Sequence, residues 1–244
     1  MSFGLEATLS NPDSDIQLCQ EFKQAGYETQ VHVVAVPKEI SSISVTTRYL
    51  HGREQTENRD GYIIHKGRHV PSHIQQSQYD NLPRSVERLA SSKHAVDTIG
   101  IYDRDGNELI VVHGKDIDSQ SIARTLESGR KLENTSLRQL ETALVNHEYN
   151  QTQNLLIQAQ PSHTPAVQAE QKTLAIDIKH ELTHAKNIEK ALPVVRKKEL
   201  VKERDKRIHK RLKENKTKNQ THTTEAEADK TSQTHMYIYF IIMV

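Results

Sequence analysis

Apolar and polar residues along the first 115 positions follow an alternation of helices and strands. Residues 13–25 carry apolar side chains at helical spacing, and Gly26 ends that pattern. Residues 31–36 form an unbroken, valine-rich run, which is typical of a strand buried on both faces of a sheet. Further helices are predicted over residues 37–52 and 80–92, and a further strand over residues 96–102. The pattern therefore predicts an α/β fold with a parallel sheet flanked by helices.

A long polar stretch and a hairpin complete this part of the chain. Residues 53–78 are polar and contain Gly61, Gly67 and Pro71, so we expect them to form mainly a loop. Residues 103–107 predict a turn that leads into a short strand over residues 108–112. Long loops in compact domains often carry binding or catalytic residues, so the polar stretch is a candidate for function.

Beyond Gly114 the pattern changes to helices separated by polar joints, predicted over residues 119–131, 136–159 and 169–192. Only 34% of the chain is hydrophobic and 5% is aromatic, which is too little for one core spread over all 244 residues. We expect a compact domain over residues 1–115, a helical extension over 116–160, a charged and basic helical region over 161–218 and a disordered tail over 219–244 with a short apolar end.

The net charge of +1 hides a strongly basic segment. Residues 196–218 contain twelve Lys or Arg against four Asp or Glu. Such a run can contact nucleic acid or an anionic membrane surface, although a solvated helix face is the interpretation that we favour.

The chain has one cysteine, Cys19, and no secretory leader or transmembrane segment is recognisable, so a cytoplasmic location is expected. Residues 236–244 are apolar, but a membrane-spanning helix needs about 20 such residues. We interpret this end as the product of read-through or a frameshift, in preference to a lipid contact or an edge strand.

Several short segments, taken in order, resemble the zeta toxin family. They cover residues 3–112 and are Leu5-Glu6-Ala7-Thr8-Leu9, Gly26-Tyr27, residues 34–41, Arg48-Tyr49, Gly67-Arg68-His69-Val70-Pro71 and residues 101–106. The resemblance implies a partial P-loop-kinase-like sheet and an ATP- and Mg²⁺-dependent kinase that phosphorylates UDP-N-acetylglucosamine, as the toxin of a toxin–antitoxin system with an antitoxin protein as partner.

The resemblance also assigns site residues. It places Glu6 and Thr8 at the sugar-nucleotide site and Arg48 and Arg68 on the transferring phosphate. Guanidinium groups suit that task, because phosphoryl transfer spreads negative charge over oxygens that a planar fork can hold. The alternatives are that both arginines are ordinary surface cations and that Glu6 and Thr8 are part of an exposed chain start.

The phosphate-binding loop of such kinases, Gly-x-x-x-x-Gly-Lys-Ser/Thr, does not occur in the 244 residues. The Asp that carries the base in the family lies upstream of the matching segment. We therefore expect an N-terminally truncated domain that is inactive by itself. The alternative from another class is a non-enzymatic remnant whose basic extension binds nucleic acid, a membrane or a partner.

A competing motif lies in the extension, where His180-Glu181-Leu182-Thr183-His184 fits the H-E-x-x-H pattern of zinc peptidases. On a helix this spacing places His180 and His184 one turn apart, with Glu181 as a general base. With 14 histidines in the chain, a chance match is the favoured interpretation. We expect Leu174, Ile178, Leu182, Ala185 and Ile188 to form the inward stripe of this helix, with His180 on the polar face.

Overall fold

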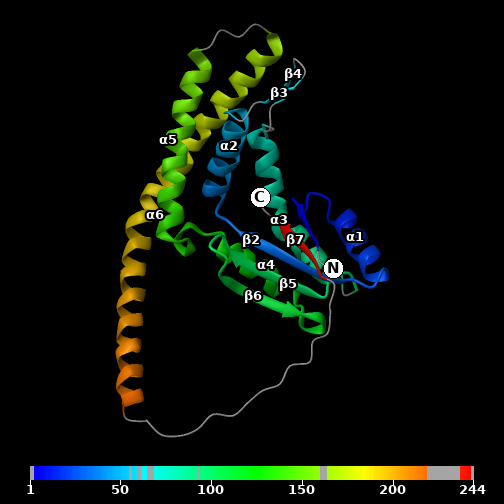
Figure 1. The fold of residues 1–244 in the computed structure, drawn as a ribbon, viewed down its shortest axis with the longest axis vertical. Helices are drawn as coiled ribbons and strands as arrows, with labels where there is room; N and C mark the ends of the chain where they lie inside the picture. The colour runs from blue at the N-terminus through cyan, green and yellow to red at the C-terminus, as the bar shows by residue number, and fades with distance from the viewer. Residues whose placement is uncertain are drawn as a thin grey trace.

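The computed structural model describes residues 3–54, 57–59, 62–64, 69–92, 94–159, 164–218 and 237–242. Helices and strands alternate in its first part, and two long helices follow (Figure 1). The elements are β1 (Phe3–Ala7), α1 (Pro12–Gln24), β2 (Glu28–Ala35), α2 (Lys38–Glu54), β3 (Glu57–Arg59), β4 (Tyr62–Ile64), α3 (Ser72–Ser91), β5 (Thr98–Asp103), β6 (Glu108–His113), η1 (Gly114–Asp116), α4 (Ser119–Gly129), η2 (Leu132–Asn134), α5 (Leu137–Ala159), α6 (Pro165–Lys218) and β7 (Tyr237–Ile242).

A five-stranded sheet organises this fold, in the order β1-β7-β2-β5-β6. All neighbours pair in parallel except β5 and β6, which form the antiparallel hairpin that the turn at residues 103–107 predicts. In that turn both carboxylate oxygens of Asp103 accept hydrogen bonds, from the backbone and side chain of Asn107 and the backbone of Asp105. The α/β fold class expected from the sequence is confirmed.

One face of the sheet carries the main hydrophobic core. Helices α1, α3 and α4 cover it, and Val31 and Val33 of β2 meet Ile99 and Ile101 of β5 there. The residues of β2 alternate between buried and half-buried, so one face of this strand is fully buried and the other is buried in part. On the second face His32 stacks on Tyr102, with 5.2 Å between the ring centres.

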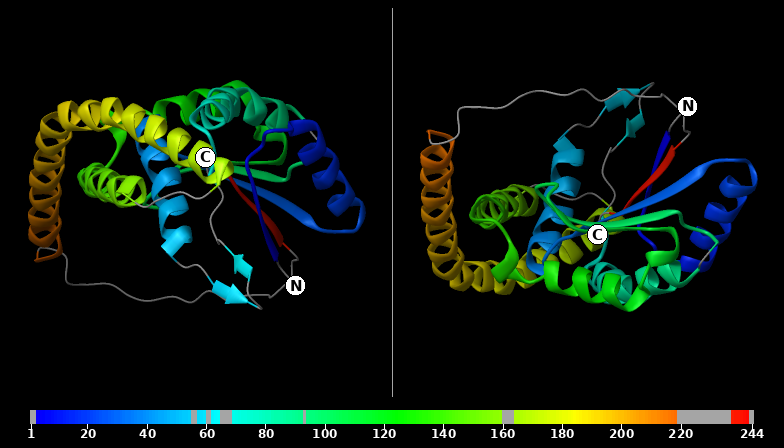
Figure 2. Two further views of the ribbon diagram at one scale, coloured as in Figure 1. Left: turned by 90° about the horizontal axis from the view of Figure 1, so that it is seen from above. Right: turned by 90° about the horizontal axis from the view of Figure 1, so that it is seen from below.

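Strand β7 comes from the apolar end of the chain and lies inside the sheet, not at its edge (Figure 2). It pairs with β1 over Phe3–Ala7 and with β2 over residues 28–33. β1 therefore joins the sheet through β7. From the sequence, residues 236–244 were interpreted as the product of read-through or a frameshift. The neighbouring residues in the sequence do not indicate which strands this segment pairs with.

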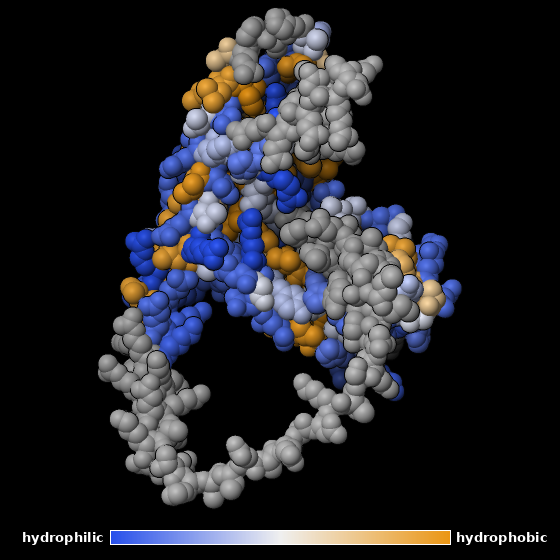
Figure 3. Space-filling model, in the orientation of Figure 1, coloured by the Kyte–Doolittle hydropathy of each residue, from blue (hydrophilic) through white to orange (hydrophobic). Residues whose placement is uncertain are grey.

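Helices α2, α5 and α6 form a second, helical unit beside the sheet (Figure 1). Ile40 and Ile43 of α2, Leu140 of α5 and Ile188 of α6 share one buried cluster. The extension is thus packed against the α/β part. Apolar side chains stay exposed near the end of α5, where Leu155 is 70% exposed (Figure 3).

The third helix begins earlier than the sequence indicates. α3 starts at Ser72, whereas a loop was expected up to residue 78, and β3 and β4 form a small antiparallel hairpin within the same stretch. The first turns of α3 are polar and face Lys38 and Ser42 of α2 and His180 of α6 across a cavity.

Candidate functional site

The candidate site lies at the carboxyl edge of the parallel sheet. β1 ends at Ala7, β2 at Ala35 and β5 at Asp103, so Thr8, Lys38 and Arg104 all follow strand ends. Ligands of open α/β sheets bind beyond this edge, because strand ends and helix starts meet there. The sheet therefore places three residues of different segments in the region where a substrate is expected.

Strained backbone marks the end of β1. Leu9 has a φ of 50°, in the left-handed region that β-carbon-bearing residues rarely adopt. This conformation places the Leu9 side chain in the core, where it is 3% exposed, while Thr8 remains exposed and donates a hydrogen bond to Ser10. Strain of this kind costs on the order of 1–3 kcal/mol and clusters at functional sites.

Two arginines approach each other at the same edge. Arg104 follows β5 and donates a hydrogen bond of 2.8 Å to Ser44 on α2, one turn before Arg48. Arg104 is exposed as a residue, but partial desolvation of its guanidinium, followed by the positive charge of Arg48, lowers the pKa of Arg104. Arg48 is exposed on α2. The charge of Asp105 opposes this effect only in part, and two guanidiniums that repel each other favour an anion between them.

Arg104 was not assigned a role from the sequence, although it lies in the segment at residues 101–106 that resembles the zeta toxins. Its position directly after an apolar strand is the signal that would have identified it, because such positions line the carboxyl edge. The sequence could not show that Arg104 lies near Arg48, since 56 residues separate the two positions.

Two of the four expected site residues have side chains outside the described part of the structure. Glu6 is placed only by the backbone of β1, and Arg68 lies outside the described residues. The residue after Arg68 is well anchored, because His69 Nε2 lies 2.9 Å from Asp177 Oδ2 on α6. Burial alone would raise the pKa of Asp177, but the contacts from His69 and Ser72 outweigh it and lower that pKa. Helix α6 therefore holds the segment that follows Arg68.

The H-E-x-x-H residues face two different directions. His180 and His184 line a cavity, whereas Glu181 is fully buried on the other side of α6. There Glu181 Oε2 accepts a hydrogen bond of 3.0 Å from Asn150 and lies 3.4 Å from His147 Nδ1. Leu182, expected on the inward stripe, is 42% exposed, and Glu181 takes the inward position instead. Within the described ranges, no three His, Cys, Asp or Glu residues are grouped so that they could hold a metal.

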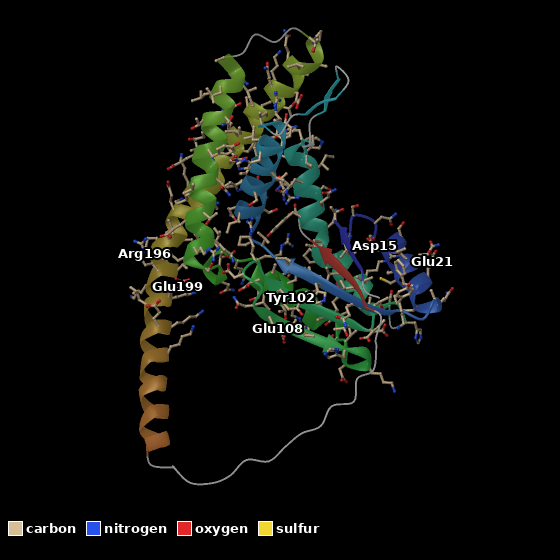
Figure 4. The ribbon with its side chains drawn as sticks, viewed as in Figure 1. Asp15, Glu21, Tyr102, Glu108, Arg196 and Glu199 are labelled. Carbon is tan, nitrogen blue, oxygen red and sulfur yellow. The ribbon has the colours of Figure 1, made fainter. Side chains whose placement is uncertain are left out.

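The start of the basic segment is engaged in packing. Arg196 contacts Glu141 at 3.1 Å, and Lys198 donates to the backbone oxygen of Glu133. Glu199, labelled with Arg196 in Figure 4, accepts a hydrogen bond of 2.9 Å from the backbone N–H of Leu137 at the start of α5. These contacts fix the first turns of the basic segment on α5 and η2.

Residues 1–115 match the model of the family described as zeta toxin. The resemblance inferred from short segments is thereby confirmed, and this part of the chain is similar to a family of kinase-like toxins. No curated protein matches the chain. Among the described helices, none has an apolar stretch of the length required to cross a bilayer.

Proposed function

We propose that residues 1–115 provide the acceptor side of a zeta-toxin-like kinase that phosphorylates UDP-N-acetylglucosamine as the toxin of a toxin–antitoxin pair in the cytoplasm. In this proposal Glu6 and Thr8 hold the sugar nucleotide, and Arg48 and Arg68 stabilise the transferring phosphate. ATP and Mg²⁺ are the cofactors that such a reaction requires. The match to the family over residues 1–115 supports this assignment.

The observation that carries the proposal is the pair formed by Arg48 and Arg104 at the carboxyl edge of the sheet. Their charges interact, and Ser44 fixes the Arg104 guanidinium on the helix that bears Arg48. A phosphate between them would neutralise the repulsion and accept hydrogen bonds from both planar groups. Arg104 therefore joins the proposed set of phosphate-binding residues.

The donor side has no counterpart within the 244 residues, because the sequence Gly-x-x-x-x-Gly-Lys-Ser/Thr does not occur in them. Backbone amides of that loop hold the ATP phosphates, and its lysine and hydroxyl serve phosphate and Mg²⁺. We therefore expect the 244-residue chain to bind the acceptor but not to turn over ATP.

Calorimetric titration with UDP-N-acetylglucosamine tests the acceptor site. We expect Glu6→Gln and Thr8→Ala each to weaken binding of the sugar nucleotide about tenfold, because each removes a hydrogen bond to it. Arg48→Ala and Arg104→Ala should instead weaken binding of inorganic phosphate, which stands in for the transferring group. Arg138→Ala, at an exposed position of α5, is the matched control and should leave binding unchanged. Equal affinity of Thr8→Ala and the unchanged chain for the sugar nucleotide would refute the proposed acceptor site.

A second measurement tests turnover. The purified chain is incubated with labelled ATP and UDP-N-acetylglucosamine, with Arg48→Ala as the background. Phosphorylation of the sugar nucleotide above that background would show that the chain is a complete kinase, contrary to our expectation.

A further inference from the structure

A cavity of about 410 Å³ lies between α2, α3 and α6, apart from the arginine pair. Ser42 of α2 lines the cavity. Each residue advances an α-helix by about 100°, so Arg48 projects from α2 about 120° away from Ser42. The wall that α6 contributes belongs to the part of the chain beyond residue 115. The cavity is therefore a second candidate site, and the extension completes it.

The side chains of the described cavity wall that can carry a charge near neutral pH are all basic. Lys38 reaches it from the first turn of α2, His73 from α3, and His180 and His184 from α6. None of the lining residues is acidic, although Glu39 acts on His184 from nearby. Burial lowers the pKa of His184, and the charge of Lys38 acts in the same direction, whereas Glu39 raises it. This wall lacks a negative charge to balance Lys38.

The remaining wall consists of neutral groups that suit sugar hydroxyls. Ser42, Ser72, Gln75 and Gln76 carry hydroxyl and amide groups, and Tyr79 adds an aromatic ring. Two of them are held in place: Gln75 donates to Ser41, and the Tyr79 hydroxyl donates 3.0 Å to the backbone oxygen of Val36 at the end of β2. The volume lies in the range of small-molecule sites, which is about 300–1,000 Å³.

The two parts of the wall together favour a ligand with a negative group and several hydroxyls. We propose that the cavity between α2, α3 and α6 binds a phosphorylated sugar, with Lys38 and the imidazole of His184 on the phosphate and the serine and glutamine side chains on the sugar hydroxyls. Gln75 and Gln76 each use an amide N–H within the protein, on Ser41 and Asp80, and their carbonyl oxygens are acceptors for sugar hydroxyls. A neutral sugar would leave Lys38 without a counter-charge.

None of the described residues assigned to the proposed kinase function lines this cavity, although Lys38 lies at the same carboxyl edge of the sheet. Binding is measured by calorimetry on the full chain with glucose 1-phosphate, glucose and sulfate as probes. We expect glucose 1-phosphate to bind most tightly, sulfate more weakly and glucose not measurably. Sulfate keeps its charge across neutral pH, so tighter sulfate binding as the pH falls from 8 to 5.5 reports protonation of His184. Glu39 and Glu181 are the acidic groups near His184 in that titration.

Variants decide whether the ligand occupies this cavity. Lys38→Gln should weaken glucose 1-phosphate binding about tenfold, since it removes a charge-assisted bond to phosphate. Because the pKa of His184 is lowered, His184→Gln should weaken sulfate binding mainly at pH 5.5, where more of the imidazole is protonated. Lys179→Gln, at an exposed position of α6 next to His180, should change nothing. Thermal unfolding of each variant confirms that it is folded.

Three results would overturn the proposal. Unchanged binding in folded Lys38→Gln would place the ligand elsewhere. Equal affinity for sulfate and glucose 1-phosphate would mean a site for inorganic anions without a sugar subsite. Loss of binding in Arg48→Ala with normal binding in Lys38→Gln would assign the ligand to the arginine pair instead, leaving the kinase proposal intact.

Discussion

Replacement of Asn150 by alanine would test whether the extension and the family-like part are one folding unit. Asn150 lies on α5 and is fully buried. Its amide nitrogen donates to the backbone oxygen of Ile43 at 3.2 Å and to Glu181 Oε2 at 3.0 Å, and its oxygen accepts from Thr47 Oγ1 at 3.0 Å. A single side chain thus connects α2, α5 and α6.

The expected loss follows from those three hydrogen bonds. Each buried bond contributes about 0.5–1.5 kcal/mol, and a buried partner left unsatisfied adds about 1–3 kcal/mol. Glu181 is the costly partner, because its carboxylate would retain only the 3.4 Å contact to His147 in this network. We expect Asn150→Ala to lower the free energy of unfolding by about 3–5 kcal/mol.

Guanidinium chloride unfolding followed by circular dichroism measures this loss by linear extrapolation. Glu148→Ala, at an exposed position on the same helix, is the control and should change stability by less than about 0.5 kcal/mol. A loss below about 1 kcal/mol for Asn150→Ala would refute the energetic role of the network. A separate transition for α5 and α6, with the remainder unaffected, would refute the single folding unit.

Three further predictions concern the α/β part. Burial raises the pKa of Cys19 to about 12, so a thiol reagent at pH 8 should label it only after unfolding; rapid labelling of the native chain would contradict its buried position. Burial alone would raise the pKa of Asp97, but Lys23 and Thr29 outweigh it and lower that pKa. The resulting stabilisation is present above the unfolded-state pKa of 3.8 and is lost as the pH falls through the lower folded-state pKa. Asp97→Asn should therefore destabilise the chain at pH 7 and flatten its acid denaturation curve below pH 4. Parallel acid denaturation curves of the variant and the unchanged chain would argue against this role of Asp97. Truncation after residue 236 removes the sheet partner of β1, so hydrogen exchange at the backbone amides of Gly4–Glu6 should rise to unprotected rates; unchanged protection would show that β7 does not complete the sheet.

Elements with strong local patterns were predictable from the sequence. α1 is bounded by Asn11-Pro12 and Gly26, and β2 and β5 are apolar runs of strand length, so local signals were sufficient for them. The start of α3 was missed because Ser72–Gln78 has no apolar periodicity of its own. Contacts with other elements hold these residues instead: Ser72 bonds Asp177 of α6, and the buried Gln75 donates to Ser41 of α2.

The candidate site was predictable to a smaller extent. The resemblance named Thr8 and Arg48 as candidate site residues. In the structure Thr8 directly follows β1 at the carboxyl edge of the sheet, and Arg48 lies on α2, the helix after β2. Arg104 could not be paired with Arg48 from the sequence, since only the return of β5 beside β2 brings the two segments together. Helix periodicity alone placed Leu182 inward. Glu181 is inward instead, because Asn150 and His147 on α5 supply the polar partners that a buried carboxylate requires.

The sequence by itself determined the local elements, the α/β class and the similarity of residues 1–115 to the zeta toxins, because these depend on short-range pattern and on the order of motifs. Only the tertiary structure decided what those elements meet. It placed β7 between β1 and β2, packed α5 and α6 on α2, and brought Lys38 and His184 to one cavity. Strand pairing and closure of a cavity bring together residues that are far apart in the chain. A local sequence pattern does not encode which distant segment will pair with the backbone of a strand or supply the polar partner of a buried charge.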